Sequence, residues 1–201
     1  MLPLDEFFTE LDRGWTHASV ADIPTPIELR IVGSTALMLQ TSYQRGTTDS
    51  DVLEIRAWPR PVAARLTALA GVTSSLSERH RLHLQFVNEA VLFLPQVPVW
   101  HAISRDGVAP TNIALRVLDV TDVLVSKLAR FAAKDLEDFE AMVRIGRLDH
   151  DRLLERFRLA VDMFAYDAHA DDLPRYVDNL HRVERDLLGR VESDIALPSW
   201  I

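Results

Sequence analysis

The residues with the clearest chemical meaning in this sequence are a glycine–serine pair and two aspartates that follow it. Gly33 and Ser34 come directly after an apolar run, and Asp49 and Asp51 stand two positions apart. Side chains two apart on a β-strand point to the same face of a sheet. Mg²⁺ prefers carboxylate oxygens together with substrate phosphates. We therefore predict that the two aspartates bind Mg²⁺ at the start of a strand.

The glycine–serine pair offers the complementary chemistry, phosphate binding. A glycine lets the backbone approach a ligand closely, and Ser34 is expected at a helix N-terminus, where N–H groups and the helix dipole favour an anion. Each feature alone has a simpler interpretation, Ser34 as an N-cap and Asp-x-Asp as a solvated turn. Their order favours phosphoryl-transfer chemistry, in which the metal activates an attacking oxygen and neutralises phosphoryl charge.

A lysine far along the chain is the third chemical feature. Every basic residue except Lys127 and Lys134 is arginine. The apolar positions around Lys127 at helical spacing are Val120, Val123, Leu124, Leu128 and Phe131. A lysine on such a face needs an anion or must extend its ammonium to solvent. Two interpretations stay open: a buried ion pair with Asp135, or a lysine directed at nucleotide phosphates.

Strands and helices are expected in the first part of the chain, and helices alone in the last third. Periodicity predicts helices near residues 5–12, 33–42, 59–70, 120–132, 135–145, 151–166 and 173–191. It predicts strands at 27–32, 52–55, 82–87, 90–94 and 114–118, with a tight turn at Asn88 and Glu89. The fold class is therefore α+β, a mixed sheet with flanking helices followed by a C-terminal helical bundle. We expect an α+β domain over 1–119 and a helical domain over 120–201 that completes the active site.

Composition limits the classes of protein that fit. The chain has 201 residues, no cysteine and a net charge of −8. The lack of cysteine excludes disulfides and thiolate metal sites and favours a reducing compartment. The N-terminus has acids where a signal peptide needs basic and apolar residues, and no stretch is apolar enough to span a bilayer. We expect a cytoplasmic protein with no membrane partner, and the acidic charge argues against general nucleic-acid binding.

The order of glycine–serine, helix and Asp-x-Asp resembles the motif of the nucleotidyltransferase superfamily. The version here, with Arg45 and Thr47 ahead of the aspartates, resembles its AbiEii-like and DUF6036-type branch. Some members of that branch are toxins of type IV toxin–antitoxin systems. The resemblance implies a nucleotidyltransferase-like fold, with Gly33, Ser34, Arg45 and Thr47 as nucleotide-binding residues.

A second block supports the same resemblance. Lys127 and Arg130 match the Lys-x-x-Arg helix of that branch, and Lys134, Asp135 and Asp138 match its (Arg/Lys)-Asp-x-x-Asp element. The resemblance implies that Lys127 and Arg130 bind nucleotide phosphates and that Lys127 and Asp135 are catalytic, alongside Asp49 and Asp51. The simpler interpretation of Asp135 is a first-turn acid that suits the helix dipole.

One departure from the superfamily affects the predicted activity. Many active members carry a third carboxylate on a later strand, whereas the predicted strand at 82–87 has none. The leading hypothesis is a Mg²⁺-dependent nucleotidyltransferase that transfers an NMP from an NTP to an acceptor such as tRNA, a protein or a small molecule, as a toxin-like protein with a cognate antitoxin. The missing acid supports an alternative, a catalytically inactive module that binds nucleotide or protein. A third hypothesis, an interaction protein using its helical tail, predicts no NTP binding.

Overall fold

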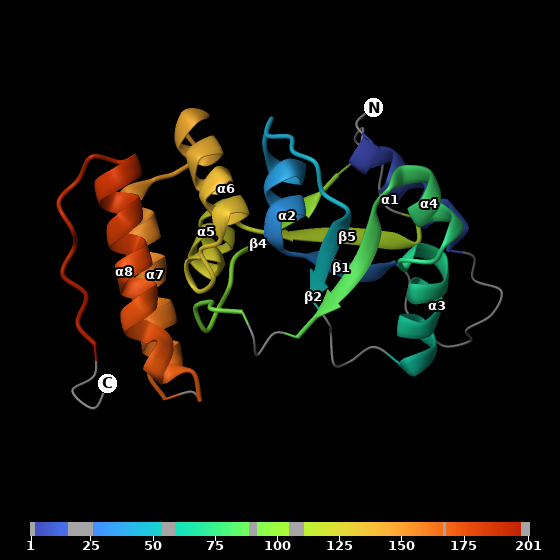
Figure 1. The fold of residues 1–201 in the computed structure, drawn as a ribbon. Helices are drawn as coiled ribbons and strands as arrows, with labels where there is room; N and C mark the ends of the chain where they lie inside the picture. The colour runs from blue at the N-terminus through green and yellow to red at the C-terminus, as the bar shows by residue number, and fades with distance from the viewer. Residues whose placement is uncertain are drawn as a thin grey trace. The chain divides into compact units, whose positions relative to one another are not determined.

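The chain forms two compact units in the computed structural model, which describes residues 3–15, 26–53, 59–88, 92–104, 111–166 and 168–197. Unit 1 comprises Met1–Glu89 and Trp100–Leu118, and unit 2 comprises Ala90–Val99 and Asp119–Ile201. The predicted fold class is confirmed: a mixed sheet lies among helices in the first part of the chain, and helices follow it (Figure 1).

Unit 1 contains a five-stranded sheet with the order β3-β2-β1-β5-β4. Its strands are β1 (Ile27–Ile31), β2 (Asp49–Leu53), β3 (His83–Val87), β4 (Trp100–Ile103) and β5 (Ile113–Leu118). β1 pairs with β5, and β2 with β3, in parallel, whereas the β1–β2 and β4–β5 pairs are antiparallel. β1 alternates buried and half-buried residues, as expected for a strand with one face against a core. The sheet therefore places β2, with its aspartates, between β3 and β1.

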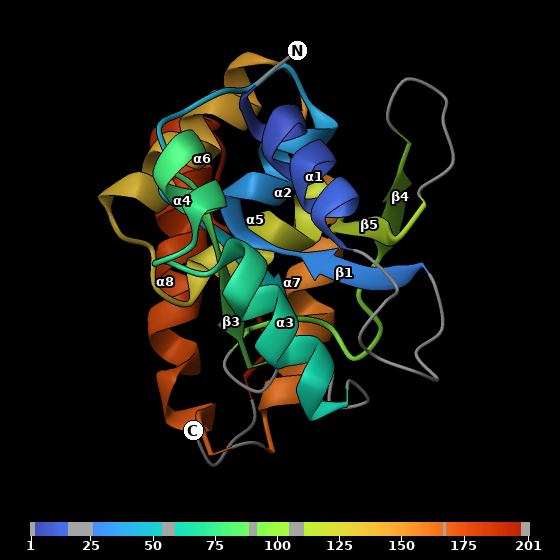
Figure 2. The same cartoon turned by 90° about the vertical axis from the view of Figure 1, so that its right-hand side faces the viewer.

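The helices of unit 1 among the described residues are α1 (Pro3–Gly14), α2 (Gly33–Gln40), α3 (Arg60–Ala70) and α4 (Ser75–His80). α1 is amphipathic and buries Phe7, Phe8 and Leu11, as its helical spacing predicts. α4 begins where the Ser74 hydroxyl accepts a hydrogen bond from the Ser77 N–H. α1, α3 and α4 pack together (Figure 2).

Unit 2 is helical. Its elements are α5 (Val120–Leu128), α6 (Ala133–Arg144), α7 (His150–Phe164), the 3₁₀-helix η3 (Ala170–Asp172), α8 (Leu173–Arg182) and the π-helix η4 (Val183–Leu187). The ring of Phe93 packs against Phe157, Phe164 and Tyr176, with ring centroids 4.9–5.4 Å apart. This aromatic cluster joins the segment before β4 to α7 and α8. Within the described ranges, every helix is too short or too polar to cross a membrane.

The predicted hairpin of residues 82–87 with 90–94 is wrong for the part that the structure describes, and Glu89, Ala90 and Val91 lie outside the described residues. β3 pairs in parallel with β2, and Leu92–Leu94 is not a strand. Phe93 is instead buried in unit 2. An apolar run of this length suits a strand or a core segment equally. The pattern therefore showed that the segment is buried but not what it packs against.

Two short elements and one helix end also differ from the prediction. β4 and α4 were not predicted, because each is too short to show a period. The last predicted helix, 173–191, ends as an α-helix at Arg182 and as a π-helix at Leu187. Gly189 then adopts a φ of +60°, and residues 190–197 form neither helix nor strand. Val191 is consequently 91% exposed.

Candidate functional site

The turn that joins β1 to α2 depends on a glycine. Gly33 begins α2 with a φ of +63°, a left-handed conformation that glycine adopts without steric cost. A Cβ atom at this position would lie 2.7 Å from Oδ2 of Asp51. The N–H of Val32 also donates to the carbonyl of Asp51, at 2.9 Å. The carboxylate of Asp51 therefore lies directly against the strand–helix turn, as close as the missing side chain allows.

Asp49 and Asp51 share one face of β2. Both are half-buried, while Ser50 between them is fully buried. The hydroxyls of Thr47 and Thr35 donate to the Asp49 carbonyl at 3.0 and 3.4 Å. These bonds hold the backbone at the start of β2, so the strand itself positions both carboxylates. The predicted geometry, two carboxylates on the same side of a strand end, is present.

The acidic pair suits Mg²⁺, because Mg²⁺ is commonly held by one or two carboxylates together with substrate phosphates and waters. The glycine leaves open the space beside Asp51 that a Cβ would fill. Within the described residues, no group of three or more acidic or histidine side chains that could hold a metal is found. In β3, His83 and Gln85 stand in register with Asp49 and Asp51. The strand beside the pair thus brings neutral Gln85 next to Asp51, and no third carboxylate.

Ser34 is not the N-cap of α2. The N-cap position is Val32, and no described side chain caps this helix. Ser34 lies in the first turn and is buried. The first-turn N–H groups and the dipole of such a helix favour an anion. The capping interpretation of Ser34 is therefore wrong, and its role in phosphate binding stays a prediction.

Arg45 and Thr47 lie in the loop before β2 and line a small pocket of about 110 Å³ with Met38 and His80. Nucleotide-sized ligands occupy pockets of roughly 300 Å³ or more, so this pocket is too small for a nucleotide. The backbone N–H of Arg45 contacts Sδ of Met38 at 3.4 Å, and the Thr47 hydroxyl donates to Asp49. Both residues shape the loop that leads to the acidic pair. Their predicted contact with nucleotide stays a prediction.

Unit 2 brings together four of the five charged residues of the second sequence block, Lys127, Arg130, Asp135 and Asp138. Nζ of Lys127 lies 3.0 Å from Oδ1 of Asp135 and 2.8 Å from Oδ2 of Asp138. Arg130 donates two hydrogen bonds to Asp135, at 2.9 and 2.8 Å. Lys127, Asp135 and Asp138 are all buried. The two cations balance the two carboxylates, so the ion pair of Lys127 with Asp135 is present in unit 2. A role of Lys127 in phosphate binding stays a prediction.

Asp135 also caps the helix it belongs to. Its carboxylate accepts a hydrogen bond from the N–H of Ala132, at 2.9 Å, as expected of a first-turn acid. Burial alone would raise the pKa of Asp135. Hydrogen bonds from Arg130, the charge and hydrogen bond of Lys127 and the Ala132 N–H outweigh burial and lower this pKa to about 2. Asp135 is therefore ionised at any physiological pH.

The turn between α5 and α6 comes earlier in the chain than the predicted break between helices 120–132 and 135–145. The helix expected over 120–132 ends at Leu128, and Phe131 adopts a φ of +48°, which is rare for a bulky side chain. The ring of Phe131 contacts Phe139 at 5.7 Å and the guanidinium of Arg182 at 5.2 Å. These contacts hold the turn that carries Arg130 towards Asp135. No short-range pattern indicates such a turn, since its contacts come from later helices.

Residues 16–175 match the model of a protein family described as a nucleotidyltransferase of unknown function, DUF6036. The chain belongs to this nucleotidyltransferase family. No curated protein matches the chain, and no solved structure matches it. The matched span contains the glycine–serine turn, the acidic pair and the Lys127 cluster. The superfamily named from the sequence motifs is thereby confirmed.

Two glycines with the same backbone conformation allow a test of the turn in this nucleotidyltransferase family member. Gly33 and Gly146 have φ values of +63° and +66°, but a Cβ at Gly146 would meet nothing within 4 Å. We expect Gly146→Ala to lower the free energy of unfolding by about 1 kcal/mol, the left-handed strain alone. Gly33→Ala should cost about 2 kcal/mol or more, because its methyl also displaces the Asp51 carboxylate. Urea unfolding of both variants measures the difference, and equal costs would contradict the close approach.

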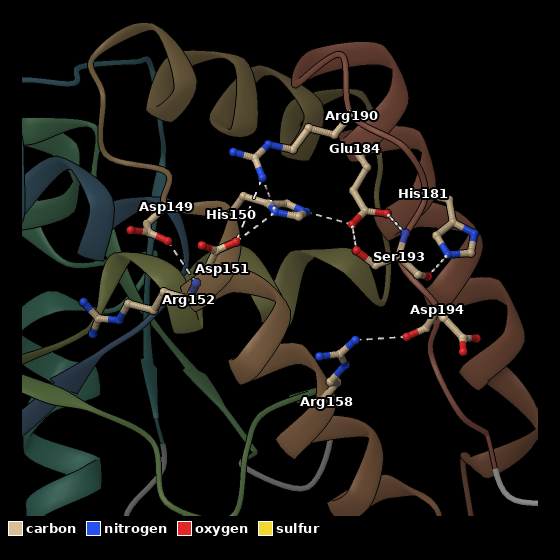
Figure 3. Close-up of polar contacts among 10 residues, drawn as sticks. All are labelled: Asp149, His150, Asp151, Arg152, Arg158, His181, Glu184, Arg190, Ser193 and Asp194. Atoms are coloured by element: carbon tan, nitrogen blue, oxygen red, sulfur yellow. Dashed lines mark hydrogen bonds and ion pairs between the residues drawn. The ribbon is translucent and has the colours of Figure 1, made fainter.

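A second polar cluster in this family member holds the chain after η4 (Figure 3). Glu184 is fully buried and accepts hydrogen bonds from the N–H and hydroxyl of Ser193, at 2.9 and 2.5 Å. Nε2 of His150 lies 2.8 Å from the same carboxylate, and Arg190 contacts Nδ1 of that ring at 3.0 Å. Burial alone would raise the pKa of Glu184, but the bonds from Ser193 and His150 lower it. Because the Ser193 hydroxyl donates to a carboxylate and not to an imidazole, this cluster is structural and not a nucleophilic triad.

We expect Glu184→Gln to loosen the segment around Ser193. The neutral amide accepts these hydrogen bonds more weakly than a carboxylate, so the local loss should be about 1–2 kcal/mol. Hydrogen exchange at the Ser193 amide should accelerate about tenfold, which corresponds to 1.4 kcal/mol. Asp186→Asn is the matched control, since Asp186 lies in the same π-helix but is exposed and pairs with Arg185 alone among the described contacts. Equal exchange rates in the two variants would refute the role of Glu184.

Proposed function

We propose that this protein is a Mg²⁺-dependent nucleotidyltransferase that transfers an NMP from an NTP to an acceptor. The observation that carries the proposal is the close approach of Asp51 to Gly33, where a Cβ would lie only 2.7 Å from the carboxylate. This approach sets the acidic pair of β2 beside the N-terminus of α2. A carboxylate pair and an anion-favouring helix end are the two features that a metal–triphosphate complex needs.

The residues of unit 1 take distinct roles in this proposal. Asp49 and Asp51 would hold the metal, and the first turn of α2, with Gly33 and Ser34, would face the triphosphate. When bound, Mg²⁺ would neutralise phosphate charge and favour ionisation of the attacking group. In the transfer, the acceptor oxygen forms a bond to the α-phosphorus, the bond to pyrophosphate breaks, and the acceptor loses its proton.

The finer parts of the proposal rest on the sequence resemblance. They are tRNA or a protein as acceptor, a toxin-like role with a cognate antitoxin, phosphate binding by Lys127 and Arg130, and catalysis by Asp135. The net charge of −8 makes a long stretch of nucleic acid a poor partner. A tRNA acceptor would therefore be contacted through a small part of its surface.

Label transfer tests the proposal directly. The full chain is incubated with each of the four NTPs, labelled at the α-phosphate, with MgCl₂ and either total RNA or total protein. We expect label to enter one acceptor class and the transfer to stop with EDTA. A parallel reaction with γ-labelled NTP should transfer nothing, because pyrophosphate leaves. No transfer from any α-labelled NTP to either acceptor class would overturn the proposal.

A second candidate function is a nucleotide-binding module without chemistry. Gln85, and not an acid, stands in register with Asp51 on the neighbouring strand, and this observation favours the second candidate. Calorimetry with each NTP and MgCl₂ separates the two. NTP binding without label transfer would support the inactive module. If the protein neither binds NTP nor transfers label, the result would support an interaction protein.

A further inference from the structure

Unit 2 contains an open groove that the proposed chemistry does not use. The groove has a volume of about 700 Å³ and lies between the segment Pro95–Val97 and one side of α7. Its lining includes Val97, Arg156, Leu159, Asp162, Met163 and Tyr166. This volume lies within the range of roughly 300–1,000 Å³ that is typical of binding pockets.

The apolar side chains that line the groove are exposed. Val97 is 74% exposed, Leu159 43%, Met163 50% and Tyr166 83%. α7 already buries a complete apolar stripe on its other side, which includes Leu153, Phe157 and Phe164. The exposed residues are therefore not needed for the core. Apolar side chains gathered in one exposed hollow are typical of a protein-binding surface.

The basic side chains around the groove are engaged in contacts within unit 2. The guanidinium of Arg156 is neutralised by the buried Asp122, with contacts of 2.7 and 2.8 Å, and also donates to the Val97 carbonyl. Arg152 pairs with Asp119 at 3.0 Å. Arg158 points instead towards the Asp194 carbonyl, as Figure 3 shows.

Two carboxylates of α7 are left without such compensation. Glu155 and Asp162 are exposed, and neither makes an ion pair or a side-chain hydrogen bond within the described part of the chain. Asp162 lines the groove, and Glu155 lies about two turns before it on the same side of the helix. The groove is thus apolar with an uncompensated negative edge.

We propose that this groove binds an amphipathic segment of a partner protein that carries apolar side chains beside lysine or arginine. Helix-in-groove recognition places apolar anchors in such a hollow, and basic residues would pair with Glu155 and Asp162. A nucleic acid would bring phosphates towards these carboxylates. A second copy of the chain in a two-fold contact would set Glu155 and Asp162 against the same residues. A basic protein segment satisfies both the apolar and the charged part of the surface.

Methionine methyl NMR on the full chain tests this proposal. The sequence has four methionines: Met163 lines the groove, whereas Met38 and Met142 are buried elsewhere. The probe is a synthetic helical peptide with a leucine face and arginine flanks. The matched peptides are a glutamate-flanked version and a scrambled arginine version without an apolar face. We expect the first peptide to shift the Met163 methyl signal and leave Met38 and Met142 unchanged.

Variants separate groove binding from general attraction to an acidic protein. Leu159→Ser should weaken binding about tenfold, and Val191→Ser, at an exposed apolar residue outside the groove, should leave it unchanged. Glu155→Gln with Asp162→Asn should weaken binding about fivefold, whereas Asp178→Asn, an exposed acid of α8, should not.

Three outcomes would overturn the proposal. The arginine-flanked peptide could leave the Met163 signal unchanged, the scrambled peptide could bind with the same affinity, or the groove variants and the control variants could lose the same amount of affinity. An RNA oligonucleotide that shifts Met163 would assign the groove to nucleic acid instead. A dimer in sedimentation equilibrium that Leu159→Ser dissociates would assign it to a second copy.

Discussion

Replacing Asp49 with alanine is expected to lower the rate of NMP transfer at least about 100-fold. Even the loss of a residue that only hydrogen-bonds a metal ligand lowers metal affinity or activity about 10–100-fold. Asp49 would supply one of only two carboxylates that hold the metal on β2. The fold should tolerate the change. The backbone carbonyl of Asp49, which the substitution keeps, accepts the bonds from Thr47 and Thr35. Initial rates with the α-labelled NTP that the wild type uses measure the effect.

A matched control makes the Asp49 result specific. Glu78 is an exposed acid of α4 in the same unit, so Glu78→Gln should keep the wild-type rate. Urea unfolding should show that the free energy of unfolding of Asp49→Ala lies within about 1 kcal/mol of the wild-type value, because the Asp49 side chain is only half-buried. Wild-type turnover by a folded Asp49→Ala variant would remove this residue from the active site. The module without chemistry predicts a different result, in which the substitution weakens Mg²⁺-dependent NTP binding and no transfer is seen in either protein.

Asp135→Asn is expected to produce the largest loss of stability, about 3 kcal/mol or more, since removing one partner of a buried ion pair leaves the other uncompensated. Asp135 is fully buried and accepts bonds from Lys127, Arg130 and the Ala132 N–H. The asparagine side chain keeps the size of the carboxylate but not its charge. Glu137→Gln, an exposed acid on the same helix, should change the free energy of unfolding by less than about 0.5 kcal/mol. A small loss with Asp135→Asn would show that the cluster contributes little to stability.

The pH dependence of the same substitution gives an independent check. The pKa of Asp135 is lowered from its ordinary 3.8 to about 2 in the folded chain. A carboxyl group with a depressed folded pKa stabilises the fold fully above its unfolded pKa and loses that contribution as pH falls through the folded pKa. The contribution of Asp135 should therefore be complete above pH 4 to 5 and decline by about 2 kcal/mol towards pH 2.

Urea unfolding of the wild type and Asp135→Asn at pH 6 and at pH 2.5 isolates this contribution. Both proteins carry the same other acidic residues, so the difference between the two stabilities reports on Asp135 and the partners it shares. We expect the stability difference to shrink as pH falls. A difference that stays constant across this range would contradict the lowered pKa.

The acidic pair was predictable from the sequence because its geometry is local. A strand sets Asp49 and Asp51 on one face through the two-residue period of its backbone. Gly33 marks the start of α2 because only glycine readily adopts the conformation that the turn requires. The ion pair of Lys127 with Asp135 also follows from the sequence as one of two possibilities, because a lysine within an apolar helical arc needs an anion.

The hairpin predicted at residues 82–94 is wrong because its outcome depends on contacts between distant segments. The run around Phe93 is apolar enough for a strand, but its ring packs on Phe157 and Phe164 of α7. β3 pairs instead with β2, in parallel. Strand pairing and core packing join residues far apart in the chain, and no local pattern encodes which of two apolar surfaces a segment will meet. Gln85 beside Asp51 and the turn at Phe131 belong to the same class of long-range outcome.

By itself, the sequence determined the fold class, the acidic pair on its strand and the glycine turn, since each depends on backbone conformations and periods that neighbouring residues specify. Only the tertiary structure decided the strand order, how closely Asp51 approaches Gly33, and the pairing of Lys127 with Asp138 as well as Asp135. It also decided the groove on α7, where Arg156 is neutralised by Asp122 while Asp162 remains exposed. Those features depend on which distant segments pack against each other and which charged side chains this packing brings into contact.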